Sequence, residues 1–218
     1  MRKSVRRVIY RFLPARLLLA LILLFSRRVG IVKAWGWARS VRLMRPLDPD
    51  DRPLPYLPYC AIELLSERLN QRIHLLEFGA GYSTLFFMNR VAHVTALEHH
   101  AQWLEIVRAR AAANVTLLPT SNESAESYAA PLRASDQHFD LILVDGRHRM
   151  ECFALALERL TPAGVIVLYD SDRAQYAGAF PLAQAAGFRV LHLRGHKADS
   201  VDLHRTSFFY RDGNCLGL

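Results

Sequence analysis

Apolar runs typical of buried strands alternate with stretches of helical periodicity through most of this chain. The runs lie at residues 73–78, 91–97, 115–118, 139–144 and 165–169, and helical patterns lie between and after them. Strands that alternate with helices in this way form a parallel sheet that is covered on both faces. The sequence therefore predicts an α/β domain with a doubly wound, mostly parallel sheet.

The C-terminal part breaks this alternation. Residues 188–193 and 207–210 have strand patterns, and the polar loop between them has no helical pattern. Two consecutive strands without a crossover helix pair in antiparallel fashion. We therefore expect a Rossmann-like, seven-stranded sheet that ends in an antiparallel hairpin.

Positive charge is concentrated at the N-terminus. Residues 1–52 hold 13 of the 28 Lys and Arg residues but three of the 20 Asp and Glu residues. Basic and apolar side chains alternate at helical spacing up to residue 46, and the apolar run at 17–25 is shorter than the about 20 residues of a membrane span. We predict that residues 1–46 form a basic amphipathic arm that binds an anionic membrane surface. The alternative is that its helices pack on the domain or on a partner subunit.

Residues 47–55 are rich in proline and aspartate, and we interpret them as a linker to a domain at 56–218. The three cysteines are far apart and lack C-x-x-C spacing, so they indicate neither a disulfide framework nor a zinc site. This fits a reducing compartment, and we expect a cytoplasmic protein, peripheral on the inner face of the membrane if the arm binds there. Nucleic acid is not an expected partner, because no aromatic-basic binding module accompanies the charge.

The most informative motif is Leu75-Leu-Glu-Phe-Gly-Ala-Gly-Tyr-Ser-Thr84, in which a buried strand enters a glycine-rich turn and then a helix. Gly79 and Gly81 let the backbone approach a ligand, and the start of the helix offers unpaired N–H groups. Thr84 stands where the dinucleotide fingerprint G-x-G-x-x-G has its third glycine. The turn therefore departs from the nicotinamide-binding pattern.

Further acidic residues follow strands at ligand-binding positions. The run 94–98 ends at Glu98, where a carboxylate can accept the hydroxyl groups of a ribose, and His99 follows it. The strand 139–144 delivers Asp145 to the carboxyl edge of the sheet, and the next strand delivers Asp170 beside it.

Three motifs in order, over residues 56–211, resemble the class I S-adenosylmethionine-dependent methyltransferases. They are the turn at Glu77–Gly81, the acid Glu98, and the Asp145 strand with the later turn Leu160-Thr-Pro-Ala-Gly164. The run Asp145-Gly-Arg-His-Arg149 is also similar to a bacterial group of uncharacterised methyltransferase-like proteins. The resemblance implies S-adenosylmethionine as cofactor, contacted by Glu77, Gly79, Ala80, Gly81, Ser83, Thr84, Glu98, His99, Asn122 and Asp145. For Asn122 we favour a helix cap, with contact to adenine as an added role.

The acceptor site has two interpretations. Catechol-type relatives bind a divalent cation at the matching strand ends, so Asp145 and Asp170 would hold a cation such as Mg²⁺, although Ser171 replaces an Asn ligand. In the other interpretation both carboxylates position the acceptor. His148 is either the general base or a histidine at a helix start without a chemical role.

We thus predict methyl transfer to a hydroxyl of a small-molecule or glycan acceptor, with His148, Asp145 and Asp170 as catalytic residues. Two alternatives stay open. One is a nicotinamide-dependent oxidoreductase, and the other is a catalytically inactive, membrane-associated binding protein of the same fold.

Overall fold

A computed structural model describes residues 17, 35–198, 200 and 202–218 of this chain. Residues 1–16 and 18–34, which carry most of the predicted basic arm, lie outside the described residues. The helices are α4 (Trp37–Leu43), α5 (Tyr59–Arg68), α6 (Tyr82–Phe87), α7 (Ala101–Arg108), α8 (Ala125–Arg133), α9 (Arg149–Arg159) and α10 (Ala179–Ala185). The strands are β1 (His74–Phe78), β2 (His93–Glu98), β3 (Val115–Pro119), β4 (Phe139–Val144), β5 (Leu160–Leu168), β6 (Arg189–His196) and β7 (Leu203–Tyr210).

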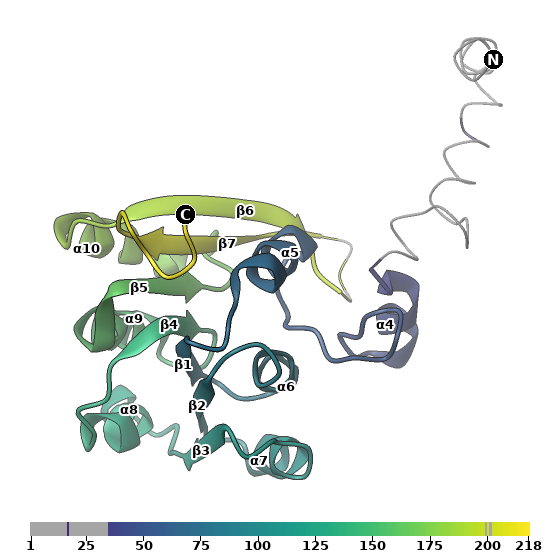
Figure 1. Ribbon diagram of the computed structural model, residues 1–218, viewed down its shortest axis with the longest axis horizontal. Helices are drawn as coiled ribbons and strands as arrows, with labels where there is room; N and C mark the ends of the chain where they lie inside the picture. The colour runs from purple at the N-terminus through teal and green to yellow at the C-terminus, as the bar shows by residue number, and fades with distance from the viewer. Residues whose placement is uncertain (1–16, 18–34, 199, 201) are drawn as a thin grey trace.

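These strands form one seven-stranded sheet in the order β3-β2-β1-β4-β5-β7-β6 (Figure 1). The first five strands are parallel, whereas β7 runs antiparallel to both β5 and β6. The Rossmann-like fold with a terminal antiparallel hairpin is therefore confirmed. Because the order reverses next to β1, the carboxyl ends of β1 and β4 border the crevice in which open α/β sheets bind ligands.

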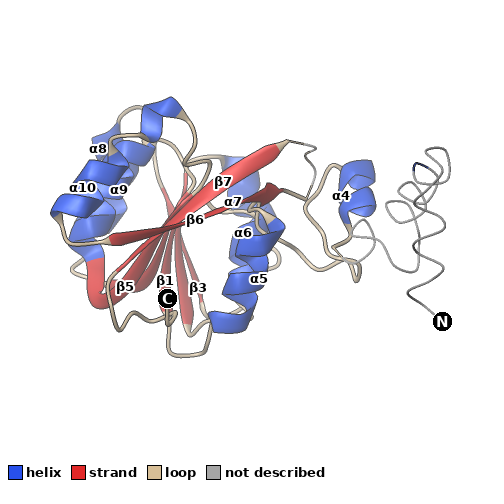
Figure 2. Cartoon of the chain, turned by 90° about the horizontal axis from the view of Figure 1, so that it is seen from above, coloured by secondary structure: helices blue, strands red, loops and turns tan. Residues whose placement is uncertain are grey.

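Two hydrophobic layers cover the sheet, with α5, α6 and α7 on one face and α8, α9 and α10 on the other (Figure 2). Along β4, Leu141 and Leu143 pack in the first layer, and Ile142 and Val144 pack in the second. Both faces of a parallel strand are thus buried, which explains why the strand runs are continuously apolar rather than alternating.

The structure differs from the sequence prediction at three element boundaries. Strand β5 begins at Leu160 instead of residue 165, because Leu160 already pairs with Phe139 across an irregularity in the ladder. The helical pattern that follows the run at 165–169 is split into a 3-10 turn at Ala174–Tyr176 and α10. The polar segment between the last two strands is largely part of β6 and β7, whose ladder extends to His196 and Leu203.

Residues 35–55 are packed on the domain. The ring of Trp35 stacks on that of Tyr59 at a centroid distance of 4.6 Å, and Trp37 Nε1 donates to the carbonyl of Ser200. Leu47 and Leu54 are buried, so the segment predicted as a linker is a turn that contributes to the core. The two tryptophans that we assigned to a membrane-facing stretch are instead turned toward the protein.

Helix α4 nevertheless leaves apolar side chains uncovered. Val41, Leu43 and Met44 are exposed, Met44 by 74%, and Arg42 and Arg45 lie among them. No helix within the described residues is long and apolar enough to span a bilayer.

Candidate active site

A cavity of about 780 Å³ lies at the carboxyl ends of β1, β2, β4 and β5. Two groups of residues line it. One half is lined by residues 79–83, 98–100, Trp103 and Tyr128. The other half is lined by Tyr56, residues 145–151, Arg173, Gln175 and Tyr176. The first half contains the glycine turn and the acid after β2, and the second contains the residues that follow β4 and β5.

The glycine turn is held in place from beneath by Glu77 and Thr84. The hydroxyl of Thr84 donates to Glu77 Oε2 at 2.6 Å and accepts from the amide of Gly81 at 3.0 Å. Burial raises the pKa of Glu77 to about 8, although hydrogen bonds from Ser83 and Thr84 oppose this rise. Neither Glu77 nor Thr84 lines the cavity. They shape the turn, and the direct cofactor contacts predicted for them are not provided by this arrangement.

Gly79 has a backbone conformation that requires glycine. Its φ of 101° is rarely adopted by L side chains, and a Cβ there would lie 3.2 Å from the Cα of Gly146. The turn after β1 therefore packs closely against the turn after β4. Gly79, Ala80, Gly81 and Ser83 all line the cavity, as the sequence predicted for cofactor-contacting residues.

Glu98 connects the glycine turn to the loop after β2 in the first half of the cavity. Its side chain is 6% exposed, Oε2 accepts from the amide of Ala80 at 2.9 Å, and Oε1 accepts from the amide of His100 at 2.7 Å. Nδ1 of His99 lies 3.2 Å from Oε1. Both Glu98 and His99 line the cavity, and a carboxylate has lone pairs beyond the two used here.

Asn122 does not reach the cavity, and it does not cap α8. It is exposed, and the cap is Ser124, whose hydroxyl accepts from the amide of Ser127 at 3.0 Å. The helix cap expected at Asn122 is therefore wrong, whereas its contact with adenine stays a prediction. Tyr128 from α8 also borders the cavity, and no sequence motif singled it out.

Arg149 is the central partner of Asp145. Its Nη2 lies 2.6 Å from Asp145 Oδ1, its Nη1 donates to the carbonyl of Tyr169 at 2.9 Å, and its Nε donates to the carbonyl of Gly146 at 3.2 Å. The Arg149 side chain is 10% exposed. Arg149, which the sequence marked only as the end of the run 145–149, thus links the turn after β4 to the end of β5.

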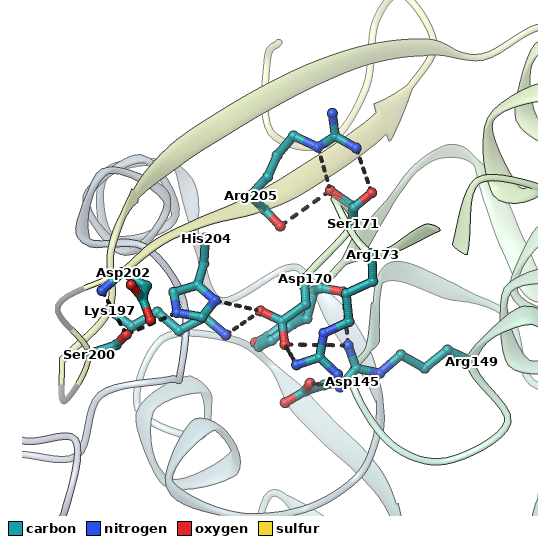
Figure 3. A network of polar contacts seen from close by, with 11 residues as sticks. Asp145, Arg149, Asp170, Ser171, Arg173, Lys197, Ser200, Asp202, His204 and Arg205 are labelled. Carbon is teal, nitrogen blue, oxygen red and sulfur yellow. Dashed lines mark hydrogen bonds and ion pairs between the residues drawn. The ribbon is translucent and has the colours of Figure 1, made fainter. Parts of the chain in front are cut away.

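Asp170 lies behind the cavity wall, surrounded by cationic groups (Figure 3). Its carboxylate contacts Lys197 Nζ, Arg173 Nη2 at 2.6 Å and His204 Nδ1 at 3.4 Å, and Arg149 Nη1 lies 3.9 Å away. Burial alone would raise the pKa of Asp170, but Lys197, Arg173 and Arg149 together lower it. Asp170 is thus an ionised structural anion, and its predicted contact with the acceptor is not supported by its position.

These contacts do not fit a divalent cation. Asp170 is occupied by Lys197 and Arg173, and Arg149 contacts Asp145 while standing close to Asp170. Ser171 lies 2.6 Å from Ser207 through its hydroxyl and is turned toward β7. Within the described part of the chain no three His, Cys, Asp or Glu side chains are grouped to hold a metal. The Mg²⁺ site predicted at Asp145 and Asp170 is therefore not built into this structure.

His148 lines the cavity at the start of α9. Its backbone is left-handed, with φ 50°, and its ring centroid lies 5.9 Å from that of Tyr128. The Nε2 atom is shielded from solvent and has no hydrogen-bond partner among the described residues. A buried ring nitrogen without a protein partner is unusual, and it leaves the Nε2 atom of His148 with an unused hydrogen-bonding position.

The fold is Rossmann-like, and comparison with known proteins identifies a methyltransferase domain on it. Residues 76–171 match the family model Methyltransf_24, described as a methyltransferase domain. This match includes the glycine turn, Glu98 and the Asp145 strand. No curated protein matches the chain.

Solved structures share the fold at low sequence identity. A methyltransferase from Pyrococcus furiosus is 18% identical, with a TM-score of 0.52 over 79% of this chain and 92% of that one. An O-methyltransferase from Bacillus cereus, in complex with SAH, is 19% identical, with a TM-score of 0.52 over 63% and 74%. An rRNA methylase from Streptococcus thermophilus is 14% identical, with a TM-score of 0.50 over 72% and 98%.

The chain thus carries a methyltransferase domain at residues 76–171, and this match supports an S-adenosylmethionine-dependent methyltransferase. The nicotinamide-dependent alternative is thereby set aside, in agreement with the terminal antiparallel hairpin.

Proposed function

We propose that this enzyme transfers the methyl group of S-adenosylmethionine to a hydroxyl oxygen of a small-molecule or glycan acceptor, with His148 as general base. One observation carries the proposal: Nε2 of His148 is shielded, has no partner among the described residues, and belongs to a side chain that lines the same cavity as the glycine turn and Glu98. The proposed base and the expected donor site therefore line the same cavity.

The first half of the cavity suits the donor. Gly79 and Gly81 allow close approach of the backbone, and the Glu98 carboxylate would accept the ribose hydroxyls with its remaining lone pairs. When bound, S-adenosylmethionine supplies an electrophilic methyl group on a sulfonium.

The second half suits the acceptor. His148 Nε2 would take the acceptor hydroxyl proton while the new C–O bond forms and the C–S bond breaks, which leaves S-adenosylhomocysteine and an imidazolium. A positioned base of this kind contributes about 10²–10⁴-fold to a rate. Asp145 stays fixed by Arg149, and we propose that it borders the reacting groups without transferring a proton itself. Proximity of donor and acceptor supplies the remainder.

The test is methyl transfer from methyl-tritiated S-adenosylmethionine into fractionated cell extract, with label counted in small molecules, glycans, protein and RNA. We expect label in a small-molecule or glycan fraction, and a loss of about 10²–10⁴-fold for His148→Ala. Affinity for S-adenosylhomocysteine, measured by calorimetry, should stay near wild type. His138→Ala is the matched control, because His138 is exposed and does not line the cavity.

Two results would contradict the proposal. Label that enters RNA would place this enzyme with methylases of nucleic acid, and full activity of His148→Ala would remove the general base.

A second proposal concerns location. We propose that the N-terminal arm holds the enzyme at an anionic membrane surface, since residues 1–34 carry nine Lys and Arg residues among apolar ones. The exposed Val41, Leu43 and Met44 of α4 and its C-terminus, with Arg42 and Arg45, would extend that surface. The protein should sediment with vesicles that contain phosphatidylserine and should be released by high salt. Equal binding to uncharged phosphatidylcholine vesicles, or binding to neither, would overturn the proposal.

A further inference from the structure

The acceptor half of the cavity holds more positive than negative charge. Three guanidinium groups line it, those of Arg147, Arg149 and Arg173, and Lys197 stands behind them. The carboxylates that face these groups are those of Asp145 and Asp170 and, at the rim, Glu151. His148 lines the same half, and His204 packs against Asp170 from β7.

The carboxylates are already paired. Asp145 is paired with Arg149, whose side chain is 10% exposed and also donates to two backbone carbonyls. Asp170 is matched by the buried Lys197, which reaches it from the β6–β7 hairpin (Figure 3). Arg173 is therefore a second cation on a carboxylate that has one, and half of its side chain (52%) is still exposed.

Arg147 is free of such contacts. Its guanidinium forms no ion pair or hydrogen bond with the described residues, although it lines the cavity beside His148. A guanidinium keeps its charge at all physiological pH values and presents paired donors that match a carboxylate or a phosphate. Arg147 and Arg173 thus offer two guanidinium groups with unused donors among the cavity-lining residues that follow β4 and β5.

The donor does not remove this excess. S-adenosylmethionine carries a sulfonium and an ammonium against one carboxylate, so it is itself a net cation, and Glu98 is the acidic side chain that lines its own half of the cavity. An acceptor with an acidic group would offset that charge, whereas a cationic acceptor would increase the repulsion.

We infer that the acceptor carries a carboxylate or phosphate group, which Arg147 and Arg173 bind while its hydroxyl faces His148. This inference rests on the proposed function, because it concerns the acceptor of the same cavity. It makes an acidic sugar, a sugar phosphate or a hydroxy acid the class of substrate.

The test uses inorganic phosphate and acetate as probes, with chloride at equal ionic strength as the control. The full-length protein is first saturated with S-adenosylhomocysteine, and thermal unfolding is then followed against probe concentration. We expect phosphate or acetate to raise Tm beyond chloride, and the stronger of the two identifies the acidic group. Arg147→Gln and Arg173→Gln should each weaken the apparent affinity about tenfold or more. Arg108→Gln is the control and should have no effect, because Arg108 on α7 pairs with Glu105 and does not line the cavity.

The inference is overturned if neither anion exceeds chloride, or if both substitutions leave the effect intact. It is also overturned if Arg147→Gln weakens S-adenosylhomocysteine itself, because Arg147 would then serve the donor's own carboxylate. Arg147 makes no contact that folding requires, so its variant is informative even if Arg173→Gln unfolds. Failure of S-adenosylhomocysteine to bind would count against the proposed donor site alone, since the anion titration can be repeated without it.

Discussion

Thr84 donates its hydroxyl proton to Glu77 across 2.6 Å and at the same time accepts the amide of Gly81. The glycine turn is therefore fixed by a carboxyl group that is 1% exposed. Because burial raises the pKa of Glu77 to about 8, this group is largely protonated in the folded protein at neutral pH.

The first prediction follows from that pKa. The folded value of about 8 lies above the unfolded value of 4.5, so the contribution to stability is complete below pH 4.5 and is lost as the pH rises through 8. Within this window each pH unit should remove up to about 1.4 kcal/mol. Urea unfolding at pH 6 and pH 9 should show a smaller loss for Glu77→Gln than for wild type. Equal losses would mean that Glu77 is ionised throughout.

The second prediction concerns Glu98. Glu98→Ala should weaken S-adenosylhomocysteine binding about 10–100-fold, because it removes a charged acceptor and releases the amides of Ala80 and His100. Glu98→Gln keeps one acceptor oxygen and should lose less. Calorimetry is the measurement, and Glu105→Gln on the exposed face of α7 is the control. Wild-type affinity in a folded Glu98→Ala protein would exclude the ribose-binding role.

The third prediction concerns the buried carboxylate of Asp170. Asp170→Asn leaves Lys197 buried without a countercharge, and we expect a loss of about 3–5 kcal/mol in urea unfolding. The exposed pair of Arg189 and Asp212 offers a matched control, in which Asp212→Asn should cost less than about 1 kcal/mol. Similar losses for both variants would show that the Asp170 cluster is not a buried network.

The fourth prediction is independence from divalent cations. The Asp170 carboxylate is taken by Lys197 and Arg173, and the hydroxyl of Ser171 is committed to Ser207. Methyl transfer should therefore proceed equally after dialysis against EDTA and after addition of Mg²⁺. An activity that EDTA abolishes and Mg²⁺ restores would mean that Asp145 recruits a cation after these contacts rearrange.

The strands, the glycine turn and the terminal hairpin could all be predicted from patterns of neighbouring residues in the sequence. Each depends on residues close in sequence: burial of both strand faces makes the runs continuous, and Gly79 occupies a backbone conformation that only glycine adopts readily. The positions of Glu98, Asp145 and His148 at the cavity followed as well, because parallel strands end at a common edge. The helix cap expected at Asn122 was wrong because the residue at which a helix begins is not set by periodicity.

What the sequence determined by itself was the order of elements, the mostly parallel sheet and the edge at which the chemistry gathers. Only the tertiary structure decided which charges meet there. Lys197 reaches Asp170 because the register of β6 on β7 brings the hairpin end over β5, and Arg149 turns inward because Asp145 and the carbonyl of Tyr169 satisfy it. Periodicity records which face of an element is buried, but an ion pair depends on the relative placement of elements that are far apart in the chain. For that reason the predicted metal pair is, in the folded protein, a set of carboxylates already neutralised by arginine and lysine.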